Sequence, residues 1–248
     1  MRFEEVVNPE VEVNPPKMLC DDEIDKNIPE PLDKKSHIYL MVGAKGSGKS
    51  SLFCSLLTSR KKPYKVYRGK FDEVIINMPQ SSADSIKGKP LKSIKASNMV
   101  ANFDLALLDK IYETAEENSS QDPPLYTLAV IDDASSKLKS NGLIISKLTE
   151  LVHKHRHLRL SLWILVQDLV SVPLSIRKNL DSCWYFRPTN EKSNQIFREE
   201  YLGGFSLKDT ADFMDYIFKK KGDVLQVKLN RIPYEFYRNF NRINITEN

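Results

Sequence analysis

A glycine-rich stretch, GAKGSGKSS (residues 43–51), carries the clearest chemical signal in the sequence. It fits the pattern G-x-x-x-x-G-K-[ST]. Glycines let a backbone wrap around a phosphate so that its N–H groups face the negative charge, while a lysine reaches the terminal phosphates and a hydroxyl binds Mg²⁺. An ordinary glycine turn is the alternative, but the stretch follows a predicted strand and opens a predicted helix. We therefore predict an ATP and Mg²⁺ site, with nucleotide contacts from Gly43, Ala44, Lys45, Gly46, Ser47, Gly48, Lys49, Ser50 and Ser51.

Two carboxylates follow a second apolar run, in LAVIDDAS (residues 128–135). The run predicts a buried strand that brings Asp132 and Asp133 to the edge of the sheet where doubly wound folds bind their ligands. We expect Asp132 to hold Mg²⁺ together with Ser50, and Asp133 to polarise the water that attacks the γ-phosphate. The alternative role for both carboxylates is solvation of a strand-to-helix turn.

Gln167 ends a third apolar run, LSLWILVQ (residues 160–167). A polar amide that leaves such a strand lies at the same sheet edge as Asp132, where it can contact the γ-phosphate or the attacking water. A strand-terminal cap is its alternative role.

The basic segment HKHRHLRL (residues 153–160) precedes that strand. Its three histidines are weak evidence for a metal, because no cysteine or carboxylate cluster accompanies them. Arg156 is a candidate arginine finger for the nucleotide of a neighbouring subunit, and Arg177, in LSIRKNLD, competes for that role. A solvated or DNA-facing charge is the alternative for both arginines.

Short apolar runs alternate with segments of helical period, which predicts an α/β fold with a mostly parallel sheet and helices on both faces. The predicted strands span residues 37–43, 71–77, 126–132, 160–167 and 182–188. We expect a Pro-rich, acidic N-terminal arm over residues 1–35, a nucleotide-binding core over 36–190, and a helix-and-strand extension of the same domain over 191–248. Within the extension, DVLQVKLN (residues 223–230) is expected to be an edge or added strand.

The composition bears on the partners of the chain and on the compartment in which it acts. The 248-residue chain has a net charge of +4, too small to indicate nucleic-acid binding by itself. Its three cysteines are far apart, which predicts neither a disulfide framework nor a zinc site and favours a reducing intracellular compartment. We find no signal-peptide pattern and no apolar run of membrane-spanning length, so we expect a soluble protein.

The motifs together resemble the poxvirus-type DNA-packaging ATPases of large double-stranded DNA viruses and their virophages, a branch of the FtsK/HerA superfamily. The resemblance depends on GAKGSGKSS as Walker A, LAVIDDAS as Walker B, and then HKHRHLRLSLWILVQD and PLSIRKNLDSCWYF in this order. It covers residues 37–188. Asp133 stands where the wider superfamily commonly has glutamate.

The resemblance implies an ASCE-type (RecA-like) P-loop fold, a ring of subunits with ATP at the interfaces, and ATP-driven movement of double-stranded DNA into a preformed capsid. It implies capsid or portal-vertex proteins as partners, and a location at the viral assembly site in the host cytoplasm and in the virion. Of the two arginines, it favours Arg156 as the finger.

DNA contact is argued from charge. The segments RKKPYKVYRGK (residues 60–70) and KGKPLKSIK (residues 87–95) are basic and suit sequence-independent phosphate contacts; ordinary solvated surface is the alternative. Two rival functions remain open at this point. One is a P-loop kinase, and the other is a nucleotide-binding adaptor without turnover.

Overall fold

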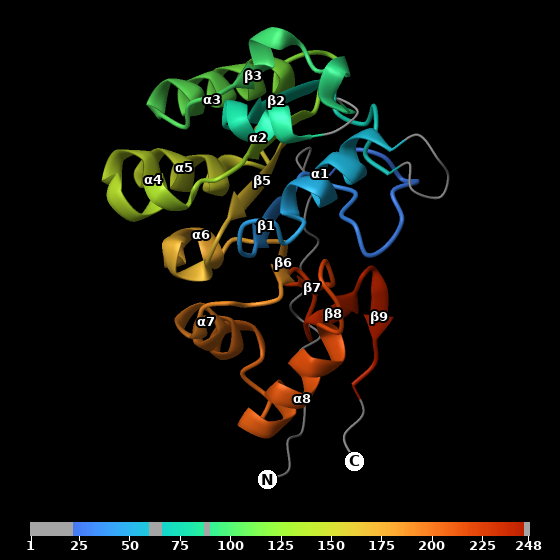
Figure 1. Ribbon diagram of the computed structural model, residues 1–248. Helices are drawn as coiled ribbons and strands as arrows, with labels where there is room; N and C mark the ends of the chain where they lie inside the picture. Colours follow the sequence, from blue (N-terminus) through green and yellow to red (C-terminus); the bar gives the residue numbers. More distant parts are fainter. Residues whose placement is uncertain (1–21, 60–65, 87–89, 246–248) are drawn as a thin grey trace, which may run out of the picture.

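The computed structural model describes residues 22–59, 66–86 and 90–245, and over these residues the strands form one sheet of nine. The strand order is β3-β2-β4-β5-β1-β6-β7-β8-β9, which runs from the top of Figure 1 downward. The first six strands in this order are parallel, and they are β3 (Met99–Val100), β2 (Glu73–Asn77), β4 (Thr127–Ile131), β5 (Leu160–Val166), β1 (Ile38–Val42) and β6 (Ser182–Phe186). The last three are antiparallel, and they are β7 (Val224–Lys228), β8 (Glu235–Arg238) and β9 (Asn241–Ile243). The predicted mostly parallel α/β class is confirmed.

Helices cover both faces of this sheet, which is why its central strands are apolar on both sides. Every residue of β1, β4, β5 and β6 is buried. In β1, Leu40 packs into the core on one face, and its neighbour Met41 packs into the core on the other. Because side chains alternate along a strand, a run such as IYLMV can serve two cores at once.

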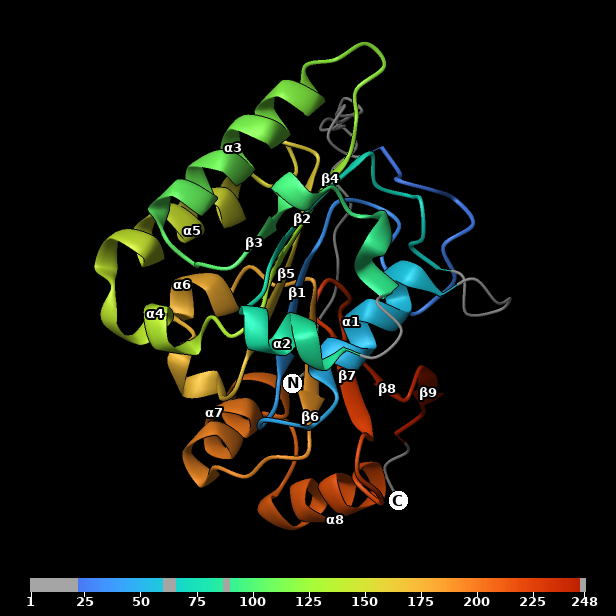
Figure 2. The same cartoon turned by 45° about the horizontal axis from the view of Figure 1, so that its top comes forward.

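Figure 2 shows α1 on one side of the sheet and α3 to α7 on the other. The first face is covered by α1 (Lys49–Thr58) together with buried residues of segments 28–32 and 66–71. The second face is covered by α3 (Leu105–Ser119), α4 (Ser135–Ser140), α5 (Gly142–Lys154), α6 (Leu174–Arg177), α7 (Glu191–Tyr201) and α8 (Leu207–Ile217). Shorter elements are α2 (Gln80–Ser85) and the 3₁₀ turns η2 (Pro90–Ser93), η3 (Ala96–Asn98) and η4 (Leu169–Ser171).

Residues 223–230 were expected to be an edge or an added strand, and the second alternative is confirmed. β7 is an added antiparallel strand and not an edge, because β8 pairs with its free side and β9 follows. In the expected arm over residues 1–35, residues 1–21 lie outside the described residues, while Ile28 and Leu32 are 2% exposed and pack into the core beside α1. No helix among the described residues is long and apolar enough to cross a membrane.

Candidate nucleotide site

The glycine-rich loop connects β1 to the first turn of α1, as Figure 2 shows. Gly46 and Gly48 have φ angles of 75° and 115°, in the left-handed region that favours glycine. A Cβ atom on Gly43 would lie 2.7 Å from both Phe186 Cβ and Ser47 Oγ, closer than real Cβ contacts. Gly46 and Gly48 therefore adopt backbone conformations that favour glycine, and Gly43 leaves no space for a side chain. β6 packs directly against the loop.

The start of α1 is built to receive an anion. Its cap residue is Gly48, which supplies no side-chain hydrogen bond, whereas the cap residue of α5 is Asn141, whose side chain accepts from two backbone N–H groups. The N–H groups in the first turn of α1 thus have no competing side-chain acceptor at the cap. Ser47 Oγ is buried in the loop and has no hydrogen-bond partner among the described residues. Both observations fit a phosphate in this loop.

Lys49 folds back over the loop. Its Nζ donates to Gly43 O at 2.5 Å and to Ala44 O at 3.1 Å, and the residue is 9% exposed. Burial lowers the pKa of Lys49, while the charges of Asp132 and Asp133 act in the opposite direction. The ammonium group therefore lies between the phosphate loop and the two carboxylates.

Ser50 and Asp132 meet beside this lysine. Ser50 Oγ donates to Asp132 Oδ2 at 3.1 Å, and Asp132, directly after β4, is 7% exposed. Burial raises the pKa of Asp132, whereas the Ser50 hydrogen bond and the Lys49 charge lower it. A hydroxyl and a carboxylate at the mouth of a phosphate loop are the oxygen donors that Mg²⁺ uses together with nucleotide phosphates. The donor set fits the predicted ion.

Asp133 and Gln167 form a second pair at the same edge. Gln167 Nε2 donates to Asp133 Oδ1 at 2.9 Å, and both residues are exposed. Asp133 has a φ of 59°, an uncommon conformation for a residue other than glycine, and its N–H donates to Asp132 Oδ1. The strained turn holds one carboxylate inward beside Ser50 and leaves the other one open to solvent, linked to the amide of Gln167.

Asn77 also belongs to this edge, although none of the sequence motifs includes it. It ends β2 and is 1% exposed, and its backbone oxygen accepts from Asp132 N at 3.0 Å. Its Nδ2 donates to Val100 O, while its Oδ1 has no partner among the described residues. The available signal was the one that identified Gln167, a polar amide at the end of an apolar strand.

Arg156 lies at the amino ends of the parallel strands, whereas the phosphate loop, Asp132 and Gln167 lie at their carboxyl ends. It is exposed in the turn between α5 and β5, whereas Gln167 follows the last residue of β5. The seven residues of β5 extend over about 20 Å, so Arg156 is far from the phosphate loop of its own chain.

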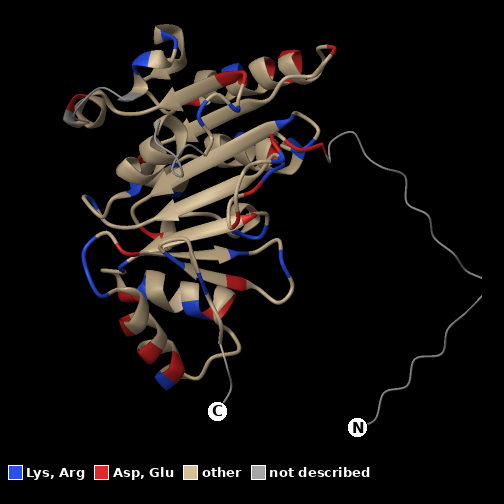
Figure 3. Cartoon of the chain, turned by 90° about the vertical axis from the view of Figure 1, so that its right-hand side faces the viewer, with Lys and Arg blue, Asp and Glu red and all other residues tan. Residues whose placement is uncertain are grey.

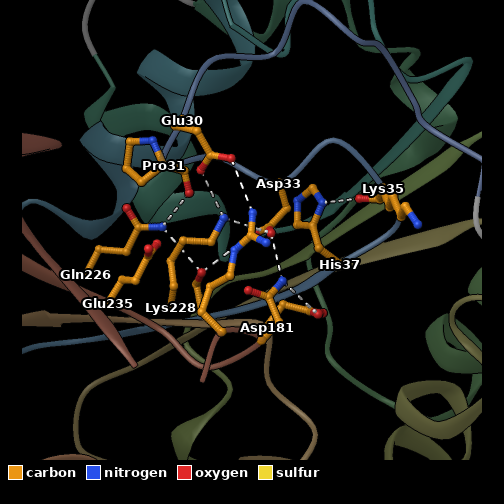
Figure 4. Close-up of polar contacts among 12 residues, drawn as sticks. Glu30, Pro31, Asp33, Lys35, His37, Asp181, Gln226, Lys228 and Glu235 are labelled. Carbon is orange, nitrogen blue, oxygen red and sulfur yellow. Dashed lines mark hydrogen bonds and ion pairs between the residues drawn. The ribbon is translucent and has the colours of Figure 1, made fainter. Parts of the chain in front are cut away.

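Arg156 lines a polar pocket of about 230 Å³ at this end of the sheet. Asp33, Asp181 and Lys228 also contribute to the lining. Figure 4 shows the network at its base, where the Lys228 side chain, 2% exposed, pairs with Asp33 at 3.2 Å and Glu30 at 3.4 Å. Burial and the charge of Asp33 together raise the pKa of Asp181 to about 6, although the charge of Arg156 acts to lower it. At the amino ends of the strands, a network of charged side chains therefore lies beside Arg156, the candidate arginine finger.

The competing arginine, Arg177, is engaged within its own chain. Its Nη2 donates to Glu200 Oε1 at 2.6 Å and its Nε to Glu200 Oε2 at 2.9 Å, and the side chain is 12% exposed. To reach another chain's nucleotide, Arg177 would have to break this ion pair.

The histidines of residues 153–160 do not converge. His155 is buried and donates from Nδ1 to Val152 O at 2.8 Å, and burial lowers its pKa to about 4, while His153 and His157 are exposed. Among the described residues, no group of three or more His, Cys, Asp or Glu side chains could hold a metal ion.

The two basic segments lie only partly within the described residues, since residues 60–65 and 87–89 are outside them. Of the remainder, Lys70 pairs with Asp25 and Lys95 with Glu73. Figure 3 shows basic and acidic positions intermixed along the described loops. The predicted DNA contact thus depends chiefly on residues outside the described ranges.

The chain resembles known proteins in its sequence and in its fold. The family model described as poxvirus A32 protein matches residues 28–224. No curated protein sequence matches the chain. Among solved structures, B204, the DNA-packaging ATPase from Sulfolobus turreted icosahedral virus, is 16% identical with a TM-score of 0.57, covering 81% of this chain and 96% of its own.

Two further structures share the fold. B204 from Sulfolobus turreted icosahedral virus 2, in complex with ATP-γS, is 19% identical over 82% of this chain and 96% of its own, with a TM-score of 0.55. EssC from Geobacillus thermodenitrificans, represented by its ATPases 2 and 3, is 13% identical over 78% of this chain and 38% of its own, with a TM-score of 0.53.

Proposed function

The chain belongs to the poxvirus A32 protein family, and we propose that this ATPase drives viral double-stranded DNA into a preformed capsid. The observation that carries the proposal is the meeting of Lys49, the Ser50–Asp132 pair and the Asp133–Gln167 pair at one edge of the sheet. Lys49 suits a site that binds a nucleotide, and the two pairs add Mg²⁺ ligands and groups that can act on the attacking water. The viral relatives named B204 are described as packaging enzymes, which supports the direction of the proposal.

The proposed chemistry follows from the position of each group. The loop amides and Lys49 hold the β- and γ-phosphates, and Ser50 and Asp132 are the residues that would hold Mg²⁺. When bound, Mg²⁺ neutralises charge that develops on the phosphate oxygens. Asp133 accepts a proton from the attacking water, and Gln167 fixes the direction of that carboxylate through its amide hydrogen bond.

We assign Arg156 to the nucleotide of a neighbouring subunit. An arginine that lies about 20 Å from its own phosphate loop can contact a γ-phosphate only in another chain. A ring with ATP at its interfaces supplies that arrangement, and the arginine would stabilise charge in the transition state. Arg177 remains the second candidate and must first leave Glu200.

The remaining partners follow from the proposed task. Sequence-independent contacts to DNA phosphates are assigned to the basic segments at residues 60–70 and 87–95. Capsid or portal-vertex proteins would anchor the ring, and the motor would act at the viral assembly site in the host cytoplasm and be retained in the virion.

The first test is release of inorganic phosphate from ATP, measured with and without double-stranded DNA. We expect DNA to stimulate turnover, and we expect Lys49→Ala and the double change Asp132→Ala with Asp133→Ala to abolish it. Lys137→Ala, which removes an exposed lysine on α4, is the control and should leave turnover unchanged. Turnover that survives the changes at the site would refute the assignment. Transfer of phosphate to a small acceptor would favour a kinase, and ATP binding without turnover would favour an adaptor.

A further inference from the structure

The strand order bears on the direction of a bound nucleotide along the carboxyl ends of the strands. The groups that face the γ-phosphate follow β4 and β5, which lie on one side of β1. The phosphate loop itself follows β1. With its γ-phosphate beside these groups, an extended nucleotide directs its nucleoside end to the other side of β1, toward the ends of β6, β7 and β8.

The order of contacts along that edge is continuous. Phe186, the last residue of β6, lies against the loop glycines and pairs with Val224 on β7. Val224 O in turn accepts from Asn239 N at 3.0 Å, in the turn between β8 and β9. Neighbouring strands are about 4.8 Å apart, so this turn lies about 10 Å beyond Phe186, within reach of an extended nucleotide.

The turn carries an aromatic residue in an unfavourable conformation. Asn239 and Phe240 form a two-residue hairpin loop with φ angles of 47° and 70°. Loops of this type favour glycine at the second position, where a bulky side chain is strained. Phe240 is nevertheless 39% exposed, so burial in the core does not explain why a phenylalanine occupies this position.

The ring of Phe240 packs against a buried aromatic residue of β6. It packs edge-on against Trp184 with ring centroids 5.4 Å apart. Trp184 is fully buried, and its indole Nε1 has no hydrogen-bond partner among the described residues. One side of the Phe240 ring therefore packs against Trp184, while the residue as a whole stays partly exposed to solvent.

We propose that Phe240 is the platform on which the adenine base of ATP stacks. The inference rests on the proposed function in taking ATP as the substrate of the phosphate loop. A phenyl ring has no hydrogen-bonding group, and every base has a π-face, so the platform binds adenine and guanine nucleotides with similar affinity. Phe240 is then a binding residue for the base, separate from the groups that act on the γ-phosphate.

The test compares ATP with inorganic tripolyphosphate, which has the phosphates but no base. Dissociation constants are measured calorimetrically for the full chain, for Phe240→Ala and for Phe240→Trp. We expect Phe240→Ala to weaken ATP binding by roughly tenfold to hundredfold and to leave tripolyphosphate binding unchanged, while Phe240→Trp keeps ATP affinity. Equal weakening of both ligands, or unchanged ATP affinity, would overturn the proposal.

Tyr234→Ala is the matched control. Tyr234 is 41% exposed, precedes β8 where Phe240 follows it, and so lies at the opposite edge of the sheet. Its replacement should leave both dissociation constants unchanged; if it weakens ATP binding as much as Phe240→Ala does, the effect is not specific to the base and the proposal fails.

Phe240→Gly separates binding from folding. Glycine relieves the left-handed conformation, so the variant should unfold at no lower temperature than the Ala variant while binding ATP as weakly. Loss of stability with full ATP affinity would make Phe240 a packing residue and overturn the proposal. The outcomes also separate the two claims: ATP hydrolysis with a KM for ATP that Phe240→Ala leaves unchanged refutes this inference alone, whereas Phe240-dependent binding without hydrolysis refutes the proposed function alone.

Discussion

At the scale of single residues, Asp133 is the group that we propose accepts a proton from the attacking water. Asn at this position can adopt the left-handed conformation and can still accept the Gln167 hydrogen bond, but it cannot accept a proton from water. We expect Asp133→Asn to keep the free energy of unfolding within about 0.5 kcal/mol and to lower the turnover number by roughly 10²- to 10⁴-fold. Urea unfolding and phosphate-release assays on the same preparation measure both quantities; turnover close to that of the parent chain would exclude Asp133 as the base.

His37 gives a prediction about pH. It is buried, donates from Nδ1 to Lys35 O at 2.8 Å and accepts from Trp163 Nε1 at 2.9 Å, so the neutral ring satisfies both partners. Burial lowers the pKa of His37 to about 4, below the 6.5 of an exposed histidine. Between pH 6.5 and 4 the unfolded chain therefore binds a proton at His37 that the folded chain does not bind. The neutral His37 ring stabilises the folded chain fully above pH 6.5, and this stabilisation is lost as the pH falls toward 4.

A variant without this histidine measures that loss. Gln at position 37 has one donor and one acceptor for the same two partners and does not titrate. Between pH 6.5 and 4.5 we expect the unfolding free energy of His37→Gln to fall less steeply than that of the parent chain, by about 1.4 kcal/mol per pH unit. The Asp181 carboxyl, with its pKa raised to about 6, acts in the opposite direction in both proteins and cancels in the comparison. Parallel curves would contradict the assignment.

Single residues also mark the limit of sequence-based prediction. Gly43, Lys49 and Ser50 could be predicted as nucleotide contacts because a fixed spacing is read directly from the chain. Asn77 was missed because its role depends on a backbone contact to Asp132 across two strands, which no local pattern encodes. Phe240 gave no signal at all, since its strain and its contact with Trp184 exist only in three dimensions.

At the scale of elements, the five longer parallel strands were predictable because burial on both faces makes them continuous apolar runs. β8 and β9 were not, since EFYR and NRI are short, carry charges and lie at one end of the sheet. β3, with two residues, is shorter than any periodicity can detect. The burial of Ile28 and Leu32 within a Pro-rich, acidic segment was hidden by its composition.

The close approach of β6 to the phosphate loop gives a prediction at this scale. Gly43→Ala introduces a Cβ 2.7 Å from Phe186 Cβ, so the loop or β6 must shift. We expect tripolyphosphate and ATP affinity to fall together by at least about tenfold, because about 1.4 kcal/mol of strain suffices. Gly142→Ala, at a position where a Cβ meets nothing within 4 Å, is the control. Unchanged affinity in Gly43→Ala would show that the loop tolerates the displacement.

At the scale of the whole molecule, the opposed positions of Arg156 and the phosphate loop predict an assembly. Mixing Arg156→Ala subunits, which keep an intact loop, with Lys49→Ala subunits, which keep the arginine, should restore turnover that neither variant shows alone. Native mass measurement with ATP and DNA present gives the number of subunits. The absence of rescue at every mixing ratio would argue against a finger supplied by another chain.

DNA binding gives a second prediction for the whole molecule. Neutralising Lys61, Lys62, Lys65 and Arg68 together should make log Kd depend less steeply on log salt, because fewer DNA phosphates are then neutralised by the protein. The slope should fall by about 0.9 for each phosphate that these side chains neutralise in the parent chain. Binding titrations at several salt concentrations measure it. An unchanged slope would assign the DNA contact to another surface.

The central claim is that ATP hydrolysis moves DNA. It is tested most directly by displacement of a triplex-forming oligonucleotide from a double-stranded DNA track, followed by fluorescence in the presence of the full chain and ATP. We expect displacement that requires hydrolysable ATP and disappears in Asp133→Asn while DNA binding persists. ATP hydrolysis at the same rate with and without DNA, with the oligonucleotide left in place, would contradict it.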